Sequence, residues 1–214
     1  MEVGLMNHPG TAFVVVDVQN DFVNGSLATA RGEVVARGIN TFLREAAPMH
    51  VVGTKDWHIQ PGDHFAPEGE EPDFQHTWPV HCVAGTPGAD IHEALEETLI
   101  PVWFHKGEYS AAYSGFEGRL AGQAEADQEG KTNGRGHRNG ESLAAWLHAE
   151  EISKVVVMGI ATDYCVKETV MDALEAGFEV EVLADLCSPV TEETGTAALD
   201  GMARAGAKVF DFQP

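Results

Sequence analysis

The stretch MGIATDYCVKETVMDALEAG, residues 158–177, joins a buried strand to a helix and decides the fold class. The run KVVVMGI at residues 154–160 is apolar and rich in β-branched residues, which is typical of a strand buried on both faces. Beyond it, apolar residues recur at every fourth position from Val166 to Leu174, and a glycine then stops the helical pattern. Cys165 is therefore predicted in the first turn of a helix, just past the carboxyl end of a strand.

Similar apolar runs occur along the whole chain, and helical patterns separate most of them. The predicted strands are residues 12–18, 50–54, 101–105, 154–160, 178–185 and 207–210. The predicted helices are residues 33–46, 140–150, 163–175 and 191–205. Strands that alternate with helices predict a three-layer α/β fold, in which a mostly parallel sheet of five or six strands lies between helices on both faces. In such sheets, functional sites form beyond the carboxyl ends of the strands.

The chain of 214 residues has a usual length for one domain, and we expect a single domain over residues 1–214. Two stretches interrupt the alternation of strands and helices. Residues 55–90 are rich in Pro, Gly, His and Asp, and such long loops are usually functional, so this loop is expected to bind a metal or a substrate. Residues 121–140 contain NG turns and little apolar content, which indicates a surface excursion.

Composition excludes several classes of protein. There are 13 Lys and Arg against 34 Asp and Glu, a net charge of −21, which argues against a nucleic-acid partner. No apolar run of about 18 residues predicts a membrane span, and no basic region followed by an apolar run predicts a secretory signal. The chain has three cysteines, an odd number, which is unlike a disulfide framework. We therefore expect the protein to be located in the reducing cytoplasm.

Polar residues follow three of the predicted strands. Asp17 ends the run FVVV, Lys106 follows VWFH, and Cys165 follows KVVVMGI. Taken singly, each has an ordinary interpretation as a turn aspartate, a solvated lysine or a buried structural thiol. Parallel strands, however, would bring a carboxylate, an ammonium and a thiol to one edge of the sheet.

These groups suit acyl transfer from an amide or ester. A helix N-terminus and a neighbouring cation can lower the pKa of a thiol from about 8.5 to roughly 3.5–7.5, and such surroundings would favour the thiolate of Cys165. The carboxylate would move protons, which contributes about 10²–10⁴-fold. Backbone N–H groups in the turn from Ile160 to Cys165 are candidates for an oxyanion hole.

A second group of candidates lies in the long loop. The segment KDWHIQPGDHF contains Asp56, His58 and His64, and WPVHC adds His81. One carboxylate with two or three imidazoles suits zinc, iron or manganese, and the residue types do not select among these metals. Scattered loop histidines are the alternative in a chain with 10 histidines.

Five segments together resemble the nicotinamidase/pyrazinamidase family of the isochorismatase-like cysteine hydrolases. They are VVVDVQNDFVNGSLA, TKDWHIQPGDHFA, WPVHCVAGTPGAD, FHKGEYSAAYSGFEG and GIATDYCV, which occur in family order and span most of the chain. The resemblance implies an isochorismatase-like, Rossmann-like fold, and a catalytic triad of Asp17, Lys106 and Cys165. It also implies a cis peptide at Ile160–Ala161 and an oxyanion hole built from the N–H groups of Ala161 and Cys165.

The resemblance further implies where the metal and the substrate bind. One divalent metal ion, zinc before iron or manganese, would be held by Asp56, His58 and His81, and His64 matches a ligand found in part of the family. Substrate-binding residues would be Phe22, Trp78, Tyr113 and Tyr164, with the first two on either side of an aromatic ring. A homo-oligomer is also in keeping with the family.

The implied activity is the deamidation of nicotinamide to nicotinate and ammonia in NAD salvage, with pyrazinamide as a further substrate, through a Cys165 thioester. Other functions stay open. They are another amidase of the superfamily that acts on a carbamoyl compound or a different aromatic amide, an isochorismatase, a metal hydrolase whose bound water attacks directly, and a metal-binding module without activity.

Overall fold

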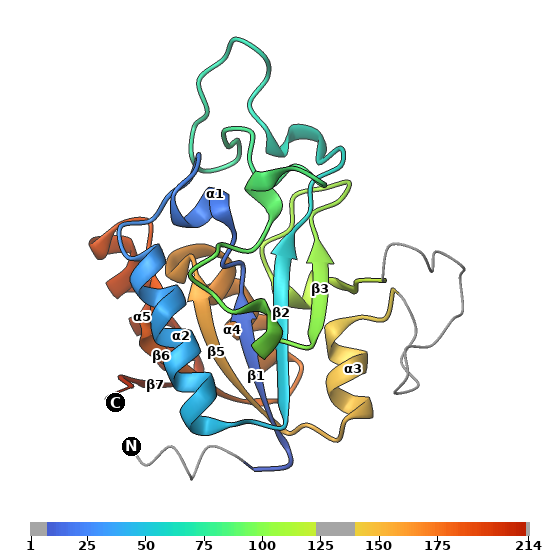
Figure 1. Cartoon of the computed structure of the whole chain (residues 1–214). Helices are drawn as coiled ribbons and strands as arrows, with labels where there is room; N and C mark the ends of the chain where they lie inside the picture. The colour runs from blue at the N-terminus through green and yellow to red at the C-terminus, as the bar shows by residue number, and fades with distance from the viewer. Residues whose placement is uncertain (1–7, 123–139, 213–214) are drawn as a thin grey trace.

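A computed structural model describes residues 8–122 and 140–212, and it contains one seven-stranded sheet in the order β4-β3-β2-β1-β5-β6-β7. All neighbouring strands are parallel except β3 and β4. Helices cover both faces of the sheet, as Figure 1 shows. The α/β class and the three layers predicted from the sequence are therefore confirmed.

The bounds of the elements follow the predicted pattern closely. The strands are β1 (Thr11–Val16), β2 (His50–Asp56), β3 (Val102–Lys106), β4 (Arg119–Leu120), β5 (Lys154–Ile160), β6 (Glu179–Ser188) and β7 (Lys208–Phe210). The helices are α1 (Asn20–Val23), α2 (Gly32–Ala46), α3 (Leu143–Ala149), α4 (Lys167–Glu175) and α5 (Glu192–Ala205), and a π-helical turn, η6 (Thr162–Val166), precedes α4. None of the helices within residues 8–122 and 140–212 is both long enough and apolar enough to cross a membrane.

Both faces of the central strand β1 are buried, and this follows from its unbroken apolar sequence. Phe13 and Val15 face a core that includes residues of α2, whereas Val14 and Val16 face a second core that includes residues of α3, α4 and α5. Successive side chains of a strand point to opposite faces, so a strand buried on both faces needs an apolar residue at every position. The helix α2 therefore forms the layer on one face of the sheet. The helices α3, α4 and α5 form the layer on the other face.

The strand order reverses next to β1, and this places the ends of β1 and β5 at the switch point of the sheet. From β1 the chain builds β2 and β3 on one side, and later it builds β5, β6 and β7 on the other. Crevices at the carboxyl ends of strands form where the order reverses in this way. Asp17 follows β1 and Cys165 follows β5, so both lie at this point.

Three details differ from the sequence prediction, and the first is the four-residue helix α1, which was not predicted. The sheet has seven strands rather than five or six, because β4 pairs antiparallel with β3 through two residues, too few for a periodic pattern. The helix predicted over residues 163–175 is α-helical only from Lys167, and Cys165 lies in η6 instead of the first α-helical turn. Most of the predicted surface excursion over residues 121–140 lies outside the described residues.

Candidate active site

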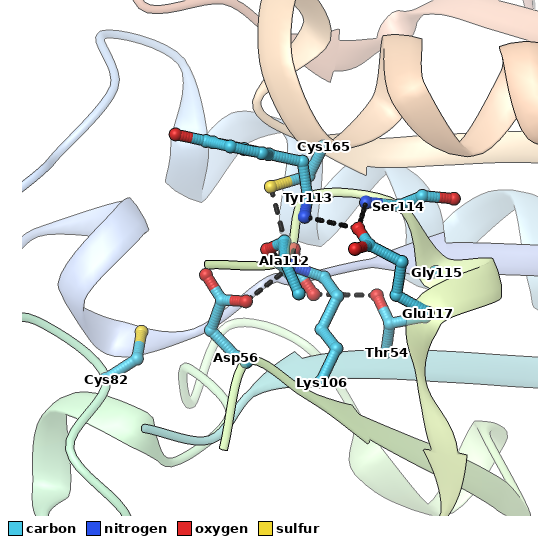
Figure 2. Close-up of polar contacts among 12 residues, drawn as sticks. Thr54, Asp56, Cys82, Lys106, Ala112, Tyr113, Ser114, Gly115, Glu117 and Cys165 are labelled. Atoms are coloured by element: carbon cyan, nitrogen blue, oxygen red, sulfur yellow. Dashed lines mark hydrogen bonds and ion pairs between the residues drawn. The ribbon is translucent and has the colours of Figure 1, made fainter. Parts of the chain in front are cut away.

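The three polar residues predicted at strand ends meet around the ammonium of Lys106. Its Nζ lies 2.9 Å from Asp17 Oδ2 and 3.6 Å from Cys165 Sγ. It also donates to Asp56 Oδ1 and, at 3.3 Å, to the carbonyl of Ala112. Figure 2 shows the Lys106 side chain reaching Asp56 and Cys165 from β3. All of these residues are buried, so little water screens their charges.

The surroundings of Cys165 raise the pKa of its thiol, so the lowering that a helix start and a cation can produce does not prevail here. Burial raises the pKa of the thiol well above its usual value, Lys106 lowers it, and Asp17 and Asp56 raise it again. The sequence argument counted one cation, but two carboxylates share that cation. Cys165 therefore rests as a neutral thiol, and its reaction as a nucleophile requires a base that removes the proton.

Asp17 is placed to be that base. One oxygen atom of Asp17 and of Asp56 and the sulfur of Cys165 all lie within 4.8 Å of one another. Thr54 Oγ1 donates to Asp17 Oδ1 at 2.6 Å, which orients the carboxylate and leaves Oδ2 toward Lys106. Burial raises the pKa of Asp17, Lys106 lowers it and Asp56 raises it, and the net shift is upward. An aspartate with a raised pKa accepts a proton more readily than an ordinary one.

The turn that carries Cys165 is closed by several backbone hydrogen bonds. The peptide bond between Ile160 and Ala161 is cis, as the family resemblance implies. The N–H groups of Tyr164 and Val166 both donate to the carbonyl of Ala161 at 3.1 Å. The carbonyl of Cys165 accepts a hydrogen bond of 2.6 Å from Thr169, a residue that the sequence analysis did not single out.

The candidate metal ligands form one buried cluster. One ring nitrogen from each of His58, His64 and His81 lies within 4.8 Å of the other two. Asp56 Oδ2 lies 3.7 Å from His58 Nε2 and 3.9 Å from His81 Nε2. The segment from β2 to β3 thus brings together all four residues predicted from its sequence, at the same edge of the sheet as Lys106.

The hydrogen bonds of the cluster fit a bound cation. Nδ1 of His58 lies 2.7 Å from the carbonyl of Gly107, and Nδ1 of His81 lies 2.7 Å from the carbonyl of Pro79. A carbonyl only accepts, so in each neutral ring the proton is on Nδ1 and Nε2 carries a lone pair. These two Nε2 atoms lie 3.3 Å apart. Two nitrogens bound tetrahedrally to zinc at about 2.0–2.1 Å would be about 3.3–3.4 Å apart.

His64 completes this fit. Its buried Nδ1 has no hydrogen-bond partner among the described residues. Burial and the neighbouring His81 and His58 lower the pKa of His64 to about 4, and burial also lowers the pKa of His81. Neutral imidazoles are the form that binds metal ions. The donor set therefore suits one divalent ion.

Two polar residues after β1 hold this arrangement, and the sequence analysis assigned them no role. Gln19 is fully buried, donates to the carbonyls of Asp56 and Ala89, and accepts the N–H of Asp56 at 2.8 Å. Asp21 accepts the N–H of Cys82, the residue that follows His81, at 2.7 Å. Both residues belong to the segment VVVDVQNDF, but only the structure shows which backbone groups they contact.

A cavity of about 260 Å³ lies over these groups. This volume is slightly below the range of about 300–1,000 Å³ for drug-sized ligands, so it suits a small ring compound. All four predicted substrate-binding residues line it, together with Cys165, Asp56, His64 and His81. The sequence analysis missed six other lining residues that lie in loops without periodicity: Ser26, Leu27, Ala28, Thr29, Phe74 and Val190.

The aromatic side chains of the cavity support one another. Trp78 Nε1 donates to the hydroxyl of Tyr113 at 2.9 Å, and the ring of Trp78 meets that of Tyr164 edge to face at 5.0 Å. Phe22 packs against His81 with ring centroids 5.5 Å apart. Rings fixed in this way offer a preformed apolar slot for a flat aromatic compound.

Known proteins resemble this chain in sequence and in structure. Residues 11–213 match the model of the isochorismatase domain. A nicotinamidase/pyrazinamidase of Mycobacterium tuberculosis is 45% identical over 200 residues, which cover 92% of this chain and 97% of that protein.

Solved structures are similar over nearly the whole chain. PnC1 from L. infantum in complex with nicotinate has a TM-score of 0.77 and 30% identity, with 96% of this chain and 95% of that chain covered. Pyrazinamidase of Pyrococcus horikoshii in complex with zinc has a TM-score of 0.71 and 31% identity, with 95% of this chain and 100% of that chain covered.

Proposed function

The chain belongs to the isochorismatase family, and on that premise we propose that it is a nicotinamidase that converts nicotinamide to nicotinate and ammonia. Pyrazinamide, which has a similar flat ring and the same carboxamide, is proposed as a second substrate. The observation that carries the proposal is that one cavity is lined by Cys165, by His64 and His81 of the histidine cluster, and by aromatic rings. Nicotinate is the product that such an enzyme would supply to NAD salvage.

The substrate would bind with its ring between Phe22 and Trp78. Both side chains are buried and line the cavity, and the burial of a flat heteroaromatic ring against them provides the affinity. The carboxamide then faces Cys165, and the pyridine nitrogen faces the histidine cluster. Tyr113 holds Trp78 through its hydroxyl group and thereby fixes one wall of the slot.

The first half of the reaction would form a thioester. Asp17 takes the proton of the Cys165 thiol while the Lys106 ammonium, 3.6 Å from the sulfur, stabilises the thiolate. The sulfur attacks the amide carbon, and the resulting oxyanion accepts hydrogen bonds from the N–H groups of Ala161 and Cys165. Asp17 returns the proton to the amide nitrogen, the carbon–nitrogen bond breaks, and ammonia leaves.

The second half would repeat these steps with water. Asp17, again a carboxylate, accepts a proton from water as the water attacks the thioester carbon. The carbon–sulfur bond breaks, Asp17 returns that proton to the Cys165 sulfur, and the acid leaves as nicotinate when its remaining proton passes to solvent. Lys106 stays charged throughout, because burial lowers its pKa but Asp17 and Asp56 raise it by more.

We assign the metal site to Asp56, His58, His64 and His81. A divalent ion supplies a Lewis acid there when it is bound. Zinc is the proposed metal, with iron and manganese as alternatives, because the separation of the two Nε2 atoms matches tetrahedral zinc and the Pyrococcus horikoshii neighbour binds zinc. Asp56 contacts both this cluster and Lys106, so it links the metal site to the reacting groups.

We expect His81→Ala to weaken metal binding more than about 100-fold, because even residues that only support a ligand change metal affinity 10–100-fold. Competition with a chromogenic chelator measures this affinity, and the wild type should bind one ion per chain. His148→Ala is the matched control, since His148 is exposed on α3 and should leave the affinity unchanged. Equal metal affinities for the two variants would show that His81 is not a metal ligand.

A carbamoyl compound with a free carboxylate is the alternative substrate, and the walls of the cavity argue against it. Within the described chain, the residues that line this cavity include no lysine and no arginine. Apart from the proposed metal ion, an anionic substrate would lose its hydration there without gaining a cationic partner. The same argument disfavours an isochorismatase, whose substrate is a dicarboxylate.

Incubation of the pure, zinc-loaded protein with nicotinamide tests the proposed function. We expect ammonia and nicotinate in equal amounts, and a kcat/KM for an N-carbamoyl amino acid at least about 10²-fold lower. Benzamide, which lacks the ring nitrogen, separates the contribution of that nitrogen from that of the carboxamide. Release of ammonia from the carbamoyl compound but not from nicotinamide would contradict the proposal.

A further inference from the structure

The cavity over Cys165 has a buried floor, and the exposed residues at its mouth include two large apolar side chains beside Ser26 and Ala28. The floor residues Asp56, His64, His81 and Cys165 are at most 6% exposed. Phe74 and Val190 line the same cavity, but they are 50% and 48% exposed. These two side chains come from different parts of the chain, the loop before Trp78 and the segment after β6.

The loop holds Phe74 in a conformation that burial does not explain. Its φ is 56°, in the left-handed region where a bulky residue is uncommon. Oδ1 of Asp73 accepts the N–H groups of Gln75, His76 and Thr77 at 2.7–2.9 Å, and the N–H of Phe74 donates to the carbonyl of Thr77. The turn is therefore built to present a half-exposed phenylalanine.

Both mouth residues are fixed to η6, the turn that also carries the thiol. The hydroxyl of Tyr164 donates to the carbonyl of Phe74 at 3.4 Å, and the N–H of Val190 donates to Asp163 Oδ1 at 3.0 Å. The ring of Phe74 also meets that of Trp78 at 90°, with centroids 6.0 Å apart. The position of Phe74 is thus set by contacts with two residues that bind the substrate, Tyr164 and Trp78, and that of Val190 by the neighbouring Asp163.

We propose that Phe74 and Val190 determine which ring substituents the enzyme accepts; this inference rests on the proposed function. With the carboxamide at ring position 3 against Cys165 and the ring nitrogen toward the histidine cluster, position 2 lies between these two groups. Position 5 is opposite position 2, so a substituent there points away from the floor and toward the mouth. The preferred substrates are therefore pyridine-3-carboxamides with hydrogen or a small group at position 5.

Substitutions at the mouth test this inference against 5-substituted substrates. For the wild type, Phe74→Ala, Phe74→Trp and Val190→Ala, kcat/KM is measured with nicotinamide, 5-methylnicotinamide and 5-phenylnicotinamide. We expect Phe74→Ala and Val190→Ala each to raise the ratio of the 5-phenyl to the unsubstituted substrate at least about 10-fold, and Phe74→Trp to lower it. Val34→Ala, at an exposed apolar residue of α2 outside the cavity, is the control and should leave the ratio unchanged.

The outcomes separate this inference from the proposed function. If the wild type hydrolyses nicotinamide but the ratio in both alanine variants equals that of Val34→Ala, the mouth does not select substituents and the inference is wrong. If Phe74→Trp raises the ratio, it is also wrong. If the wild type hydrolyses none of the amides, the proposed function fails and this inference fails with it.

Discussion

Cys165→Ala should lower the turnover of nicotinamide at least about 10⁴-fold, because loss of a nucleophile removes the covalent route itself. The variant should keep its metal, since the histidine cluster does not depend on the sulfur. It should also keep its fold, because alanine fits the space that the buried thiol leaves. Turnover is measured as ammonia release, metal content by elemental analysis, and the fold by thermal unfolding.

Cys187→Ala is the matched control. Cys187 is as well buried as Cys165 but lies within β6 and does not line the cavity, so its loss should leave turnover near the wild-type value. Cys165→Ala with a tenth or more of the wild-type activity would mean that the sulfur does not attack the amide. A metal hydrolase that uses bound water would then account better for the site.

Lys106→Met should lower both the stability of the protein and its turnover of nicotinamide. The ammonium is fully buried between two carboxylates, and removal of one partner from a buried ion pair costs about 3–5 kcal/mol. At about 2–4 °C per kcal/mol for a chain of this size, Tm should fall by roughly 6–20 °C. Turnover should fall by about 10²–10³-fold, because the thiolate loses its nearest cation.

Lys208→Met is the control for the predicted fall in Tm, because it removes a lysine that is exposed rather than buried. Lys208 and Glu179 are 60% and 70% exposed and 3.9 Å apart, and such surface pairs contribute about 0–1 kcal/mol. Thermal unfolding of the two variants gives the comparison. Equal Tm values for Lys106→Met and Lys208→Met would show that the buried ammonium does not hold the site together.

The loss of stability in Lys106→Met should also depend on pH. Lys106 lowers the pKa of Asp17, so without it this pKa rises further in the folded state. The folded variant then binds a proton that the unfolded chain has released, and its stability falls as pH rises. The difference in Tm from the wild type should therefore be greater at pH 8 than at pH 5.

The strand ends were predictable from the sequence because buried parallel strands have a strong signature. Runs such as FVVV and KVVVMGI can be recognised without tertiary information, and a parallel sheet brings their carboxyl ends together. Asp17, Lys106 and Cys165 could therefore be grouped before their distances were known. The same argument placed Asp56 at this edge, because it ends β2.

The electrostatics of the site could not be predicted in this way. The pKa of Cys165 depends on how many carboxylates share one ammonium, and that number follows from contacts between residues far apart in the chain. The strand β4 was missed because two residues carry no period, and the π-helical form of η6 has no sequence signal of its own. Phe74 was missed because the sequence does not distinguish a loop phenylalanine that lines a cavity from one that does not, and only the structure shows the cavity.

A covalent adduct on Cys165 tests the central claim most directly. The zinc-loaded enzyme is mixed with nicotinamide, quenched in acid within milliseconds, digested and examined by mass spectrometry. We predict a nicotinoyl group on the peptide that contains Cys165, which appears before nicotinate and disappears as nicotinate forms. Nicotinate produced at the full rate with no adduct on that peptide at any time would contradict the account.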